Sequence, residues 1–173
     1  LLIDANFSSK NYELAAKGNY SINNLDFLKI NFKNKFDNNL FNFLIDFDYK
    51  NNFELNLINY KKSKNSLANF LLEFETKNNK IFVKNFHFKE DQNSIKINGI
   101  DLKDSELMSF NKIEVSTLNN NFVINNRDKI MIKGNKLDAT NLTKFLNKEN
   151  NNNKFSKFSK NIEINLKNIK IPM

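Results

Sequence analysis

The sequence predicts a mainly β protein, and three observations support this fold class. Apolar and polar residues alternate in most runs of the chain, as they do in strands that send successive side chains to opposite faces. Polar clusters rich in Asn separate these runs at intervals of roughly ten to fifteen residues. No helical periodicity occurs before residue 100. We therefore expect a long antiparallel meander that forms a curved, groove-like sheet.

The stretch from Leu40 to Ile58 shows the alternation most clearly. Apolar side chains occupy every second position, and mostly polar side chains lie between them. Asn51 and Asn52 interrupt the pattern in the middle. Asn tolerates a positive φ better than most residues do, which suits a two-residue turn between antiparallel strands. The stretch therefore predicts a β-hairpin with one apolar and one polar face.

Similar runs lie on both sides of this stretch. The pairs Asn38-Asn39 and Asn78-Asn79 and the cluster Asp91-Gln92-Asn93 predict turns between strands. In the run after residue 68, the side chains expected on one face are Phe70, Leu72 and Phe74. In the next run, the side chains expected to share a face are Phe82, Phe86 and Phe88.

The period changes after residue 138. Leu142, Phe145 and Leu146 have the i, i+3, i+4 spacing of one helical face. Asp138 or Thr140 can cap this helix by accepting hydrogen bonds from its free backbone N–H groups. We expect one short α-helix near 139–148, a flexible break up to residue 154, and a last alternating run from Ile162 onward.

A sheet with one apolar face has to bury that face. It can fold onto a second sheet, close on itself, or curl around an apolar ligand, and the sequence leaves these alternatives open. Aromatic and aliphatic side chains suit acyl chains, because burial of apolar surface requires no hydrogen-bond geometry. The same residues also suit a packed core. The residues expected to line a lipid groove are Phe41, Phe43, Ile45, Phe47, Phe53, Leu55, Leu57, Phe70, Leu72 and Phe74.

Catalytic motifs are absent from the sequence, so we expect no enzyme, no cofactor and no metal site. There is no Cys, no Gly-rich phosphate loop, no HExxH motif and no nucleophile elbow. The single histidine, His87, is expected on an apolar strand face in a structural role. Paired carboxylates such as Asp46 and Asp48 lie two residues apart and are expected to point into solvent.

The net charge of +8 favours anionic partners in general. The lysines are nevertheless dispersed through turns and polar strand positions, and no block of five basic residues occurs. Binding of single-stranded nucleic acid requires aromatic side chains interleaved with basic ones on one exposed face. Here Phe and Lys fall on different faces, so we expect no nucleic-acid partner.

One segment resembles a known family. The run from Lys129 to Leu146, KIMIKGNKLDATNLTKFL, combines a strand containing Gly134, a Leu137-Asp138-Ala139 step and a short helix. It resembles a recurring unit of the AsmA-like family of Gram-negative envelope proteins, in particular the AsmA-like C-terminal region of the large YhdP-type members. The following run, NIEINLKNIKIP, is compatible with the long β-meanders of that family.

The resemblance implies a single segment, residues 1–173, of a repeating β-groove in a longer protein. A start without Met also leads us to expect a fragment. Membership would imply a periplasmic location, an inner-membrane anchor outside this chain, and non-enzymatic transport of phospholipid to the outer membrane or support of its integrity. Acyl chains would lie on the apolar concave face. The alternative is a structural or adhesive β-sandwich with a closed core and no ligand.

Overall fold

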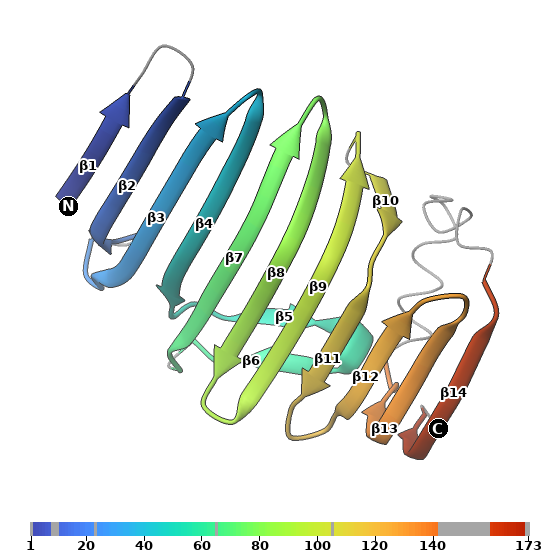
Figure 1. Ribbon diagram of the computed structural model, residues 1–173. Helices are drawn as coiled ribbons and strands as arrows, with labels where there is room; N and C mark the ends of the chain where they lie inside the picture. The colour runs from blue at the N-terminus through green and yellow to red at the C-terminus, as the bar shows by residue number, and fades with distance from the viewer. Residues whose placement is uncertain are drawn as a thin grey trace.

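The computed structural model describes residues 2–7, 11–22, 24–64, 66–104, 106–141 and 160–171. These residues form one curved, open sheet of 12 strands and a separate two-stranded sheet (Figure 1). The strands of the large sheet are β1 (Leu2–Phe7), β2 (Asn11–Tyr20), β3 (Leu28–Asp37), β4 (Leu40–Tyr49), β7 (Ala68–Lys77), β8 (Lys80–Glu90), β9 (Asn93–Lys103), β10 (Glu106–Ser109), β11 (Lys112–Ser116), β12 (Asn121–Asn126), β13 (Ile130–Asp138) and β14 (Ile162–Lys170).

The sheet follows the order β1-β2-β3-β4-β7-β8-β9-β11-β12-β13-β14, with β10 paired to β9. Every step from β1 to β13 is antiparallel, which confirms the predicted meander. The last step differs, because β14 runs parallel to β13. A parallel neighbour requires the chain to return across the sheet before it pairs, so the meander ends at β13.

The predicted hairpin from Leu40 to Ile58 is wrong. β4 pairs with β3 on one side and with β7 on the other. Residues 53–62 instead leave the large sheet and form β5 (Phe53–Leu55), the 3₁₀ turn η1 (Asn56–Ile58) and β6 (Tyr60–Lys62), an insertion that we call the β5–β6 hairpin. Figure 1 shows it lying across the ends of β7, β8 and β9.

The turns at Asn38-Asn39 and Asn78-Asn79 are confirmed. Asp37 pairs with Leu40 and Lys77 with Lys80, so each turn has two residues. All four asparagines have a positive φ, between 49° and 64°. Two consecutive residues in this region are typical of the type I′ turn, whose twist matches that of the flanking strands.

The predicted short helix falls almost entirely outside the described residues. Residues 139–141 form a turn after β13, and residues 142–154, with most of the helix and the flexible break, are not described. The final alternating run is confirmed as β14.

Bulges shift which residues share a face. Between β7 and β8, Glu73 pairs with Asn85 and Phe74 with Val83, so Lys84 is an extra residue. Phe86 and Phe88 therefore share a face with Val83. Phe82, which we expected on their face, pairs with Glu75 on the opposite one.

Candidate functional site

Seven of the predicted groove residues lie side by side on β4 and β7. Cross-strand partners share a face, and Phe43 pairs with Phe74, Ile45 with Leu72, and Phe47 with Phe70. The rings of Phe43 and Phe74 are stacked with centroids 4.6 Å apart, and those of Phe47 and Phe70 are 5.1 Å apart. We call this side of the large sheet the apolar face and the other side the polar face. Phe41 also lies on the apolar face, next to Phe43.

The apolar face extends over strands that the predicted site omitted. Phe36 pairs with Phe41 at a centroid distance of 4.6 Å, and Tyr12 stacks on Phe36 at 5.4 Å. Phe32 lies 6.2 Å from Phe43. The alternation within residues 28–37 could have indicated these positions, because Phe32 and Phe36 lie an even number of positions after Ile30 and so share its face of the strand.

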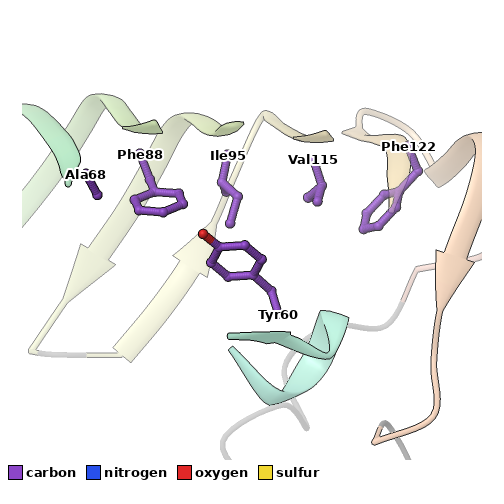
Figure 2. Packing of buried hydrophobic residues seen from close by; sticks show 6 residues of the cluster. All are labelled: Tyr60, Ala68, Phe88, Ile95, Val115 and Phe122. Atoms are coloured by element: carbon purple, nitrogen blue, oxygen red, sulfur yellow. The ribbon is translucent and has the colours of Figure 1, made fainter. Parts of the chain in front are cut away.

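The β5–β6 hairpin covers one end of the apolar face. Phe53 lies 5.3 Å from Phe88 and 5.9 Å from Phe70, between ring centroids. Tyr60 contacts Phe88 edge to face at 5.6 Å between ring centroids, and Figure 2 shows its ring facing the side chains of Phe88 and Ile95. The buried apolar cluster between the hairpin and the large sheet consists of Tyr60, Ala68, Phe88, Ile95, Val115 and Phe122.

Leu55 and Leu57 do not belong to the lining of a groove. They lie on the hairpin, and their exposed fractions are 37% and 46%. The hairpin directs Phe53 onto the sheet and leaves these two leucines facing outward. Their placement in the predicted site followed from the incorrect pairing of residues 53–57 with β4.

A buried lysine fixes one side of the hairpin. Lys62 has an exposed fraction of 0%. Its Nζ donates to the carbonyl oxygens of Ser66 at 2.5 Å, Ser63 at 2.9 Å and Lys50 at 3.2 Å. Burial lowers the pKa of Lys62, and the nearby carboxylate of Glu90 opposes this effect. The ammonium thus satisfies three carbonyl groups in the loops that flank the hairpin.

Glu90 links the hairpin to the end of β8. Its buried carboxylate accepts hydrogen bonds from the hydroxyls of Tyr60 and Ser66. Burial, followed by the hydrogen bond to Glu90, raises the pKa of Tyr60. A buried carboxylate with two donors is satisfied, so this contact holds Tyr60 in a single position on the apolar face.

A second polar network holds the other side of the hairpin. Asn59, which has a φ of 45°, donates from Nδ2 to Asp138 Oδ2 at 3.1 Å. The fully buried Asn120 donates to the carbonyl of Ile58 at 2.7 Å and accepts from the backbone N–H of Asp138 at 2.8 Å. Because both sides of the hairpin are held through buried polar groups, its position over the sheet is fixed.

Asp138 is the centre of this second network. Its Oδ1 accepts from the backbone N–H of Thr140 at 3.1 Å and from the hydroxyl of Thr140 at 2.5 Å. The hydrogen bond from the Thr140 side chain, with that from Asn59, lowers the pKa of Asp138 to about 2 against an opposing effect of burial. The contact to Thr140 closes a local turn, and the helix that Asp138 was predicted to cap lies almost entirely outside the described residues. The contacts to Asn59 and Lys170 were not predicted.

The rest of the apolar face is open within the described residues. The side chains of β4 are all partly exposed. The hairpin reaches Tyr49 at the end of this strand, and no described segment lies over Phe41, Phe43 and Ile45. Two hollows of about 610 and 410 Å³ open on the polar face instead, over β1, β2, β3, β4 and β7. They share the residues Asp4, Ala15, Lys33 and Leu44. The uncovered aromatic side is thus a surface along which a ligand can lie.

His87 lies on the polar face, contrary to our expectation. It pairs with Leu71 and Lys96, and its Nε2 is 3.0 Å from Ser94 Oγ. Burial, together with the charges of Lys96 and Lys89, lowers its pKa. Among the described residues, no group of three or more His, Cys, Asp or Glu side chains is placed to hold a metal ion.

Comparison with protein-family models, with curated proteins and with solved structures finds no match to this chain. The AsmA-like resemblance therefore remains a prediction from one sequence segment. In the described part of the chain, no helix has the length and apolar character needed to cross a membrane.

Proposed function

We propose that this chain is a non-enzymatic lipid-binding segment whose apolar face holds acyl chains. The observation that supports this function is a continuous aromatic surface that crosses β2, β3, β4 and β7 beyond the β5–β6 hairpin, where no described segment covers it. Rings in contact run from Tyr12 through Phe36, Phe41 and Phe43 to Phe74. An ordinary single-sheet protein would bury such a surface under another layer.

The physical basis is burial of hydrocarbon on hydrocarbon. Removing apolar surface from water contributes about 25 cal/mol per Å² and requires no directional contact. A strand of ten residues is roughly 33 Å long, at about 3.3 Å per residue, which exceeds the length of an extended acyl chain. An acyl chain on this face gains contact with aromatic rings while a polar headgroup remains at the hydrated strand ends.

The AsmA-like resemblance of residues 129–146 is the basis for proposing a wider process. In that setting, the segment belongs to a longer periplasmic protein anchored in the inner membrane by a region outside this chain. It carries phospholipid toward the outer membrane or supports the integrity of that membrane. Its partners are phospholipid acyl chains and, through other segments, the two membranes.

Site-specific photo-cross-linking tests acyl-chain binding with a matched control. Benzoylphenylalanine replaces Phe43 on the apolar face or the adjacent Leu44 on the polar face, both of which are partly exposed. The protein is irradiated with phospholipid vesicles, and covalent lipid adducts are measured by mass spectrometry. We expect adducts at position 43 at least several-fold above those at position 44.

Co-purification gives a second measurement. Protein prepared without detergent is extracted with organic solvent, and phospholipid is quantified against folded protein. Equal cross-linking at both positions, or folded protein that carries no phospholipid and forms no adduct, would contradict lipid binding. The latter result would favour a purely structural β module.

A further inference from the structure

The two edge strands of the large sheet, β1 and β14, each have a partner strand on one side only within the described residues. Within these residues, their outer backbone N–H and C=O groups have no partner strand, as is typical of sheet edges that pair with a further strand. Both edges also place apolar side chains in solvent. Exposed fractions are 59% for Ile3 on β1, and 61% and 57% for Ile162 and Ile164 on β14.

Soluble sheet proteins usually protect their edges with short strands, bulges or inward-pointing charges. β14 is nine residues long, and it carries Ile162, Ile164 and Leu166 in register with Ile130, Ile132 and Gly134 of β13. These side chains continue the apolar face up to the last strand. The pattern of β14 is thus that of an interior strand that lacks one neighbour.

The directions of the two edges are compatible with each other. Nine antiparallel steps lead from β1 to β13, so these two strands point in opposite directions. Because β14 runs parallel to β13, β14 also points opposite to β1 (Figure 1). A second copy in the same orientation therefore brings its β1 antiparallel to β14 of the first copy. An antiparallel last step would have made this contact parallel.

We propose that copies of this chain associate head to tail, with β14 of one copy paired to β1 of the next. The faces match when Ile3 lies opposite Leu166 and Ala5 opposite Ile164, because all four residues belong to the apolar face. In the same register, Asp4 and Asn165 meet on the polar face. The contact joins two sheets into one and continues the apolar face across both copies.

Such a contact is heterologous and does not close on itself, so assembly produces an open-ended ribbon whose length depends on protein concentration. The second copy adds its own apolar residues to the surface described above. The proposal concerns only the sheet edges and does not depend on lipid binding. The two ideas can therefore fail separately.

The absence of native cysteine makes disulfide cross-linking a clean test. Two variants of the 173-residue chain, Ile3→Cys and Leu166→Cys, are prepared with tags of different mass, mixed and oxidised. We expect a mixed disulfide between the two variants, because directly opposed strand residues lie within reach of a disulfide. Each variant alone should remain largely uncross-linked.

Sedimentation of the unmodified chain over a range of concentrations gives the second readout. We expect species larger than a monomer, and we expect Ile164→Lys to shift the chain to monomer because it places a charge on the apolar side of the edge. Asn165→Lys adds the same charge on the polar side, opposite Asp4, and should leave assembly unchanged or strengthen it. A monomer at all concentrations, or disulfides only between like variants, would overturn the proposal.

Discussion

At the scale of single residues, Lys62 shows how a charged side chain can specify the position of a short insertion. Its ammonium is removed from solvent and donates to carbonyls on both sides of the β5–β6 hairpin. Tyr49 lies beneath it, with the ring centroid 5.8 Å from Nζ. A buried cation with these partners tolerates few alternative positions of the hairpin, because any shift leaves carbonyl groups unsatisfied.

Replacement of this lysine should therefore destabilise the fold. Lys62→Met keeps most of the side-chain volume but leaves buried carbonyls without a donor, and we expect a loss of about 1–3 kcal/mol in the free energy of unfolding. Chemical denaturation measures this loss. Lys61→Met is the matched control, because Lys61 is exposed and pairs only with Glu54 at the surface. Similar effects of the two substitutions would contradict the structural role of Lys62.

Asp138 should give the fold a specific acid sensitivity. Its pKa is lowered to about 2 in the folded state, below the ordinary value of 3.8. Its ionised form therefore stabilises the fold fully above the ordinary pKa, and this contribution disappears as the pH falls through about 2. We expect Asp138→Asn to be less stable than the natural chain at neutral pH, and this difference to shrink between about pH 4 and about pH 2.

Thermal unfolding across this pH range measures that difference. The exposed Asp128 provides the control, since Asp128→Asn removes a carboxylate that lies outside the network of Asp138. A constant difference in stability between the natural chain and Asp138→Asn from neutral pH to about pH 2 would show that the carboxylate does not act as we describe.

At the scale of elements, the asparagine turns define the strands. Asn78 and Asn79 have φ values of 49° and 60° and connect β7 to β8. Asn79→Val should cost about 1–2 kcal/mol, because a β-branched residue is strained in the left-handed region. Asn79→Gly should be neutral or slightly stabilising. Chemical denaturation of both variants tests this, and a Val variant as stable as the Gly variant would contradict it.

The same elements show which parts of the fold the sequence could predict. Strand alternation and turn chemistry are local properties, so most strands and the turns at Asn38-Asn39 and Asn78-Asn79 were predictable. Pairing is not local. Residues 53–57 alternate as a strand of the large sheet would, but their partner is β6. The bulge at Lys84 was also missed, because one extra residue reverses the faces without changing the composition.

The candidate site was predictable to the same extent. Phe41, Phe43, Ile45 and Phe47 share one strand, and their common face follows from the alternation alone. Their union with Phe70, Leu72 and Phe74 depended on the pairing of β4 with β7, which the structure provides. The buried contacts of Lys62, Glu90 and Asp138 join residues far apart in the chain, and local sequence patterns do not predict such contacts.

At the scale of the whole molecule, protection is expected to vary across the sheet. β8 and β9 have partners on both sides, and their ends lie under the β5–β6 hairpin. β1 and β14 have one partner each within the described residues. Amide hydrogen exchange should therefore be slowest in the centre of β8 and β9 and fastest at the outward-facing amides of β1 and β14.

Exchange measured by mass spectrometry at several protein concentrations separates the local stability of the edge strands from protection by pairing between copies. At low protein concentration, the edge amides should exchange fully before the amides of the central strands exchange to a measurable extent. Edge amides as slow as those of β8 in dilute protein would contradict this gradient of local stability.

The insertion of residues 50–67 between two directly paired strands also sets an order of events. β4 and β7 can pair as soon as the intervening loop closes, and the loss of chain entropy on closure rises only slowly with loop length. The hairpin, in contrast, can dock only after β8, β9, β11 and β12 have assembled the surface that receives Tyr60. We therefore expect docking of the hairpin to be a late folding step, and until it occurs the apolar cluster that Tyr60 completes stays exposed to water.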